Sequence, residues 1–415
     1  MQEGILIYNN KLLWLIAILL FCSIAVYELT GFYYVLAIPL LLEYLFIVIH
    51  DWKKAYWILL FTIPISIQFT IINHGLSISF PDEPIAWIFL FLTLIILAEG
   101  KHTIPKGWWR NPITLIILLQ FVWLVVAVTY SEMLLFSLKF LLAKVWYVAT
   151  FFIVPIWIFR EKKDFIKGYK MVLIPLLITM FIIMIRYSFY EFKFANISQA
   201  VGMLYYNHVE YSTVLSMIFP LVLTAYIISK EAGEQKSKKY FILITFFLLC
   251  VFFAFARAAM IAVVFAVFVG WTIKKQLVNY IMPVIYTFML LAFLYMSNDR
   301  KYIEYRPKYD HTLMHDNFVD HILATFKGRD ISSMERFHRW IAAIRMSNDR
   351  PITGFGPHSF YYHYKPYTVS LFKTYASENV ERSTTHNYFL LMLVEQGIPA
   401  MLLYALLIII VFAQA

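Results

Sequence analysis

Long apolar runs separated by short polar connectors make up most of the chain. Many of these runs are nearly free of charged residues, and helices of this length cross all or most of a ~30 Å hydrocarbon core. The pattern predicts twelve membrane-spanning helices, at residues 12–28, 32–50, 55–73, 85–99, 112–130, 136–159, 171–189, 209–229, 240–255, 258–273, 277–296 and 389–412. A single helix through 240–273 would place Arg257 in mid-membrane, so we predict two helices and a tight turn there.

One long polar stretch, residues 297–388, interrupts this pattern before the last apolar run. It holds seven of the eleven histidines: His311, His315, His321, His338, His358, His363 and His386. The sequence predicts an all-α integral membrane protein in three parts: a bundle of about eleven helices (1–296), a large, mostly helical loop (297–388) and a last transmembrane helix (389–415). Ionisable groups are costly in a bilayer, so we expect the chemistry in this loop and at the helix ends that face it.

Lys and Arg are distributed unevenly between alternate connectors. One set of connectors holds seventeen of them, whereas the short connectors of the opposite set hold only Arg186, Lys193 and Arg257. The positive-inside rule then places both termini in the cytoplasm and the 297–388 loop outside. The net charge of +10 is therefore mostly a topology signal, and nucleic acid is not an expected partner. Only Cys22 and Cys250 are present, both in apolar runs, so no disulfide framework is predicted.

Several charged side chains lie toward the outer end of the predicted bundle. Arg257 occupies the shortest outer connector, and a guanidinium there suits phosphate, which it binds through two parallel hydrogen bonds. Lys139 and Lys144 lie near the start of the sixth span, where they either bind substrate or extend to the lipid head groups. His208 and Glu210 precede the eighth span on the same side and are candidates for acceptor or lipid contacts.

The segment 332–356 is predicted to form an amphipathic helix followed by a glycine turn at Gly354 and Gly356. Arg336 and Arg339 recur on it at helical spacing. They form either a phosphate-binding group or a solvated basic face. The two glycines are weak evidence of a site, since such turns often only connect elements.

His386 and Asn387 lie where the loop re-enters the membrane. The ordinary pKa of histidine, about 6.5, suits proton transfer at neutral pH, although an interfacial polar residue is the alternative. The spacing of His311, His315 and His321 is compatible with zinc. A solvated loop face is preferred for them, so no metal site and no cofactor are predicted.

Together these segments resemble the O-antigen ligase/polymerase superfamily. The resemblance rests on R-x3-W at Arg336 to Trp340, on NDRPITGFGPHSF and on THNYFLLMLVEQGIP. The family pattern ends in E-x-G-x-x-G, and Ala400 replaces its last glycine. A serine–arginine pair commonly precedes an outer helix in the family, and Ala256–Arg257 is similar except for alanine in place of serine.

The resemblance implies a GT-C-like glycosyltransferase of the bacterial inner membrane with a periplasmic active site. Its donor would be a glycan on undecaprenyl diphosphate, and its acceptor a hydroxyl of lipid A-core or another glycan. His386 would be the base, and Arg257 and Arg336 would stabilise the leaving diphosphate. Arg339, Lys139, Lys144, His208, Glu210, Asn387, Gly354 and Gly356 are the predicted substrate-binding residues. Attack at the anomeric carbon predicts inversion, and the lack of an Asp-x-Asp motif in the sequence fits a metal-independent transfer.

Other functions remain open on this evidence. An O-antigen or exopolysaccharide polymerase and a protein O-oligosaccharyltransferase would use the same donor, so only the acceptor separates them from a ligase. A polysaccharide transporter or flippase belongs to another class. Internal repeats and helices broken at mid-membrane are typical of many transporters, and we find no convincing repeat in this chain.

Overall fold

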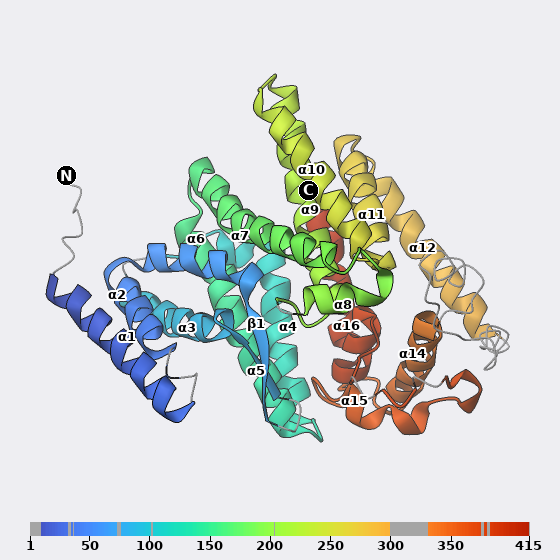
Figure 1. Cartoon of the computed structure of the whole chain (residues 1–415). Helices are drawn as coiled ribbons and strands as arrows, with labels where there is room; N and C mark the ends of the chain where they lie inside the picture. The colour runs from blue at the N-terminus through green and yellow to red at the C-terminus, as the bar shows by residue number, and fades with distance from the viewer. Residues whose placement is uncertain are drawn as a thin grey trace. The chain divides into compact units, whose positions relative to one another are not determined.

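A computed structural model describes residues 10–31, 35, 37–72, 76–100, 103–202, 204–298, 331–374, 377–379 and 382–414. This described part is nearly all helical and contains one two-stranded hairpin (Figure 1). The predicted helical class is therefore confirmed. The chain divides into two compact units, Met1–Ile85 with Ile158–Thr179 and Ala86–Trp157 with Met180–Ala415. The predicted division at residues 297 and 389 stays a prediction.

The first unit begins with α1 (Asn10–Thr30) and α2 (Ala37–Thr62). α2 is broken by a kink at the non-helical residue Asp51, which agrees with the predicted break between the spans 32–50 and 55–73. The predicted end at residue 73 is wrong, because α2 ends at Thr62. A 3₁₀ turn (Ile63–Ile65) follows, and β1 (Ile67–Ile72) then pairs antiparallel with β2 (Leu76–Phe80). Hydropathy alone does not separate a short apolar strand from the end of a helix, which explains the error.

Two helices continue from the first unit into the second, α3 (Asp82–Glu99) and α7 (Lys162–Ser188). The other long helices of the second unit are α4 (Pro112–Thr129), α5 (Leu134–Val148), α9 (His208–Glu231), α10 (Lys236–Phe253), α11 (Arg257–Lys274), α12 (Val278–Ser297), α14 (Ile331–Asp349) and α16 (Tyr388–Gln414). Short elements complete it: the 3₁₀ turns Trp108–Arg110, Phe194–Asn196, Lys365–Tyr367 and Ser370–Phe372, the π turn Ala149–Ile153, and helices α6 (Val154–Ile158), α8 (Ile197–Val201) and α15 (Phe360–His363). Within this unit α4 packs against α5 and α16, α9 against α10 and α11, and α14 against α16.

Six helical stretches of the described residues are long and apolar enough to cross a membrane. They are Pro112–Thr129, Leu134–Ile158, Lys162–Ser188, His208–Glu231, Arg257–Lys274 and Tyr388–Gln414. Two shorter apolar helical stretches, Ala17–Thr30 and Val278–Ala292, accompany them. These helices make the chain a multi-pass membrane protein, but the predicted number of twelve spans is not confirmed. The predicted turn before Arg257 is confirmed, since α10 ends at Phe253 and α11 begins at Arg257.

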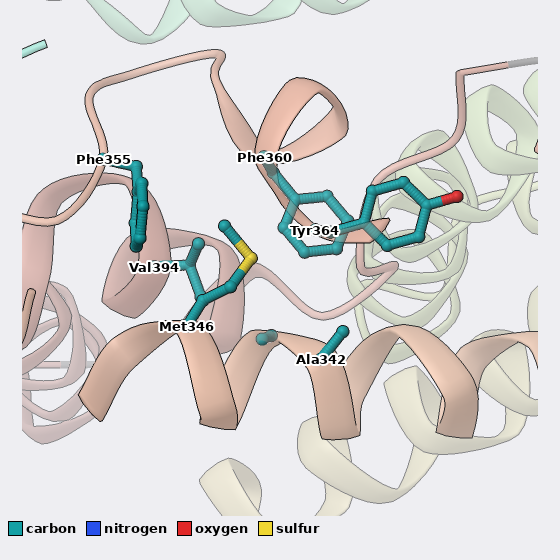
Figure 2. Packing of buried hydrophobic residues seen from close by; sticks show 7 residues of the cluster. Ala342, Met346, Phe355, Phe360, Tyr364 and Val394 are labelled. Carbon is teal, nitrogen blue, oxygen red and sulfur yellow. The ribbon is translucent and has the colours of Figure 1, made fainter. Parts of the chain in front are cut away.

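A buried cluster fixes α14 against the chain that follows it (Figure 2). Ala342 and Met346 on α14 face Phe355, Phe360 and Val394, which come from the next loop, from α15 and from α16. All five side chains are at most 5% exposed. This packing holds the polar face of α14 in a defined place relative to the start of α16.

Candidate active site

Arg339 on α14 is buried and bound inside the protein. Its Nε donates to the carbonyl oxygen of Glu335 at 3.0 Å, and its Nη1 donates to the carbonyl oxygen of Thr384 at 3.1 Å. The Glu335 carboxylate lies 4.0 Å from Nη2 and also accepts hydrogen bonds from Thr374 and Ser377. Arg339 therefore holds the chain before α16 against α14. Its predicted contact with a substrate stays a prediction.

Arg336, one turn earlier on α14, has a different environment. Its side chain is half-buried, and its Nε is buried without a hydrogen-bond partner among the described residues. Buried donors normally have a partner, and one that lacks a partner points to a ligand or water that would complete it. Arg336 is therefore the better candidate of the two arginines for binding an anion.

Two residues before α16, Thr384 and Thr385, are held by hydrogen bonds from α14. The indole N–H of Trp340 donates to the carbonyl oxygen of Thr385 at 2.7 Å, next to the Arg339 contact with Thr384. The Thr385 hydroxyl donates to the carbonyl oxygen of Asn387 at 2.8 Å. His386 lies between these anchored residues with φ of 49°, in the left-handed region that few non-glycine residues adopt.

Asn387 caps the start of α16. Its side-chain oxygen accepts hydrogen bonds from the backbone N–H groups of Phe389 (3.1 Å) and Leu390 (3.3 Å). Such a cap satisfies donors that have no partner inside the helix. The contacts therefore give Asn387 a structural role, and its predicted substrate contact stays a prediction.

The imidazole of His386 has solvent access and lies in the positive field of two arginines. Partial burial, and then the charges of Arg339 and Arg336, lower the pKa of His386 to about 4. The side chain is therefore neutral at pH 7, and a neutral imidazole nitrogen can accept a proton. An anion bound to Arg336 would offset part of the positive field and raise this pKa, which would make His386 a stronger base when a diphosphate is present.

The two glycines after α14 are closely packed, Gly354 against the backbone of α16 and Gly356 against Ser131. A side chain at Gly354 would place Cβ 2.4 Å from the carbonyl carbon of Glu395, and one at Gly356 would place it 2.1 Å from Oγ of Ser131. Both glycines also have positive φ. Close packing already requires glycine at these two positions, and their predicted substrate contact stays a prediction.

Glu395 in α16 is 4% exposed and organises the same loop. Its carboxylate oxygens accept hydrogen bonds from the backbone N–H groups of His358 (2.9 Å) and Phe360 (3.1 Å). The carbonyl groups of Val394 and Glu395 accept from the N–H groups of Phe355 and Gly356. The segments Pro351–Gly356 and Glu395–Gly397 thus form one structural unit. The sequence did not predict that these two segments are in contact.

α16 bends sharply at Gly397, where φ is 79° and ψ is 180°. The ring centroids of Tyr388 and Tyr404 lie 4.8 Å apart, whereas sixteen residues of straight helix span roughly 24 Å. The two arms of α16 therefore lie side by side. The bounds of α16 agree with the predicted span 389–412, but the helix is broken at Gly397, which the sequence did not predict. The carbonyl oxygen of Pro351 accepts from the N–H of Ile398, and the indole N–H of Trp123 donates to the carbonyl oxygen of Gln396 at 2.7 Å. These contacts satisfy backbone groups that the bend releases.

The start of α5 contacts the loop after α14. The Ser137 hydroxyl donates to the carbonyl oxygen of Pro357 at 2.7 Å, and the ring of Phe136 stacks with that of His358. Burial, followed by the charge of Lys139, lowers the pKa of His358. Lys139 thus adds positive charge to this loop, while Lys144 lines a cavity against α4 and α16.

Three predicted residues come from other helix starts. Arg257 is the first residue of α11, after a turn in which Phe255 has φ of 52°. His208 and Glu210 form the first turn of α9. There Oγ of Ser198 lies 3.1 Å from Nδ1 of His208, and the Glu210 carboxylate accepts from the N–H of Tyr206 at 2.8 Å. Contacts of these residues with a substrate stay predictions.

His311, His315 and His321 lie outside the described residues. Among the residues that are described, no three His, Cys, Asp or Glu side chains are grouped so that they could hold a metal ion.

The apolar helices define a multi-pass membrane protein, and the residues around His386 form its candidate active site. Residues 241–405, about two fifths of the chain, match the sequence model of the O-antigen ligase family. The match confirms the resemblance to this superfamily, whose members are O-antigen ligases and related polymerase-type, glycosyltransferase-like membrane enzymes. The matched residues run from α10 into α16 and include Arg257, Arg336 and His386. Neither a curated protein nor a solved structure matches the chain.

Proposed function

We propose that this protein transfers a glycan from undecaprenyl diphosphate to an acceptor hydroxyl, and that the reaction is O-antigen ligation to lipid A-core. The observation that carries the proposal is His386, kept neutral next to Arg336 and held in place by Trp340 and Arg339. Such a centre pairs a proton acceptor with a guanidinium whose Nε has no hydrogen-bond partner among the described residues. A glycosyl transfer from a diphosphate needs both groups.

The chemistry requires one proton transfer and one displacement. His386 takes the proton of the acceptor hydroxyl as its oxygen attacks the anomeric carbon of the donor sugar. The bond between that carbon and the diphosphate oxygen breaks, and undecaprenyl diphosphate leaves with the electron pair. Arg336 and Arg257 stabilise the negative charge that develops on this leaving group. A single displacement inverts the anomeric configuration, and two arginines supply the charge stabilisation without a metal ion.

The membrane orientation is also a proposal. The bias of Lys and Arg between connectors supports cytoplasmic termini and a periplasmic site in the bacterial inner membrane. The donor's lipid tail then lies in the outer leaflet, and the acceptor reaches the site from the periplasm or from the same leaflet.

Purified protein should be incubated with undecaprenyl-diphosphate glycan and three separate acceptors: lipid A-core, a growing glycan chain and an acceptor protein. Glycosylated lipid A-core with an inverted linkage, identified by mass spectrometry and NMR, is the expected product. Extension of the glycan alone would identify a polymerase, and modification of the protein an O-oligosaccharyltransferase. Movement of the intact lipid-linked glycan across a vesicle membrane, without any new glycosidic bond, would instead indicate a flippase.

A further inference from the structure

A cavity of about 250 Å³ lies between α4, α5 and α16. Most of its lining is apolar, from residues such as Phe121, Leu124 and Phe140. Five of its lining residues have polar ends that can donate hydrogen bonds: Gln120, Lys144, Tyr388, Gln396 and Tyr404. Tyr388 connects this cavity to the candidate active site, because it follows His386 by two residues.

One donor of this cavity has no hydrogen-bond partner in the described part of the chain, and one cation of the cavity has no carboxylate beside it among the described lining residues. The side-chain amide nitrogen of Gln120 is buried and has no hydrogen-bond partner among the described residues. The ammonium of Lys144 lies 5.4 Å from the ring centroid of Phe140, and no Asp or Glu side chain is among the described residues that line the cavity. An ammonium in apolar surroundings is costly unless an anion accompanies it.

The shortage of acceptors defines the chemistry of a ligand. A group that brings negative charge and several acceptor oxygens would satisfy the ammonium and the amide together. The apolar remainder of the lining suits a hydrocarbon chain attached to that group. Both features are combined in a phosphate at the head of a lipid.

We propose that the cavity binds the phosphate of a lipid, with Lys144 and Gln120 donating to the phosphate oxygens. The first part of the lipid tail lies against the apolar lining. Polyprenyl diphosphates, phosphorylated lipid A and ordinary anionic phospholipids share this chemistry. The binding is independent of the proposed transfer reaction, but a role for the bound lipid in catalysis rests on the proposed function.

The test uses the full-length protein in nanodiscs of phosphatidylcholine. Undecaprenyl diphosphate, diphosphoryl lipid A and phosphatidylglycerol are titrated separately, and bound lipid is measured by native mass spectrometry. Lys144→Met should weaken the binding of at least one probe about tenfold or more, the usual effect of losing a charge-assisted hydrogen bond. Gln120→Leu should weaken the same probe by a smaller factor, and Lys144→Arg should retain most of the affinity. Lys239→Met, at an exposed lysine of α10, is the matched control and should bind as the wild type does.

The probe that loses affinity identifies the source of the phosphate. Unchanged affinity for all three probes in both Lys144→Met and Gln120→Leu would overturn the proposal, as would an equal loss in Lys239→Met. Gln120→Leu keeps the test decisive if Lys144→Met does not fold. Glycan transfer is measured on the same preparations. Wild-type protein that binds a probe through Lys144 but transfers no glycan to any acceptor would refute the proposed function and leave this proposal intact. Glycan transfer by wild-type protein, with no phosphate binding that depends on Lys144, would refute this proposal and leave the proposed function intact.

Discussion

The hydrogen bond from Trp340 to the carbonyl of Thr385 should control the catalytic rate through His386. Trp340→Phe keeps an aromatic ring at this position, although a smaller one, and removes the indole N–H. The lost bond is 2.7 Å long, and Thr385 is fully buried. Leaving a buried carbonyl without its donor costs about 1–3 kcal/mol, so the backbone next to His386 should shift to find another partner.

A shift of about 1 Å in a catalytic group lowers a rate by roughly 10²-fold. We therefore expect the kcat of Trp340→Phe to fall about 10- to 100-fold. Donor affinity should stay close to that of the wild type, because the indole N–H that is removed binds the carbonyl oxygen of Thr385 and not a proposed diphosphate ligand. Steady-state transfer on purified protein, combined with donor titration, separates the two quantities.

A double-mutant cycle decides whether Trp340 acts through His386. His386→Ala alone should cost about 10²–10⁴ in rate, and adding Trp340→Phe to it should lower the rate little further. Trp109→Phe is the control, because Trp109 lies elsewhere in the chain with a side chain that is 54% exposed. Rate losses that simply multiply in the double mutant would refute the reasoning, since Trp340 would then act independently of His386.

Further predictions concern the arginines, pH, the bend and the topology. Arg336→Ala should lose about 2–4 kcal/mol of transition-state stabilisation with an unchanged melting temperature. Arg339→Ala should instead lower the melting temperature, because it leaves Glu335 buried without its cation. The opposite pattern would assign the catalytic role to Arg339 and the structural role to Arg336. The value of kcat/KM should stay constant as pH falls from 8 to 5 and decline only near the pKa of His386, about 4, where the imidazole becomes protonated. A decline centred near 6.5 would show that burial and the two arginines do not lower this pKa. Gly397→Ala should destabilise the protein by several kcal/mol, since its Cβ would lie 1.8 Å from the carbonyl oxygen of Ile352, while Gly270→Ala, which meets nothing within 4 Å, should leave the thermal melt nearly unchanged. A membrane-impermeant thiol reagent should label Ser332→Cys in intact cells and leave Lys163→Cys unlabelled, and external labelling at Lys163 would reverse the proposed orientation.

The sequence alone determined the class of protein and most of its helices. Apolar runs of sufficient length predict spans because backbone polar groups in lipid must be satisfied within the helix. The split before Arg257 was predictable for the same reason, since a guanidinium in mid-membrane is costly. The motifs that contain Arg336 and His386 also pointed to the family that the comparison found. Each of these conclusions depends on residue type and local spacing, which the sequence records directly.

Only the tertiary structure decided how these segments meet. Arg336 and Arg339 are equivalent by spacing, and their difference comes from Glu335, Thr384 and the packing of α14. The fold-back at Gly397 depends on contacts with residues more than forty positions earlier. Hydropathy reports the preference of a segment for lipid but carries no information on the partners of its backbone. The lowered pKa of His386 likewise arises from partial burial, and then from charges that helix packing brings near it. Burial and electrostatic fields both depend on distance in space and not on separation along the chain.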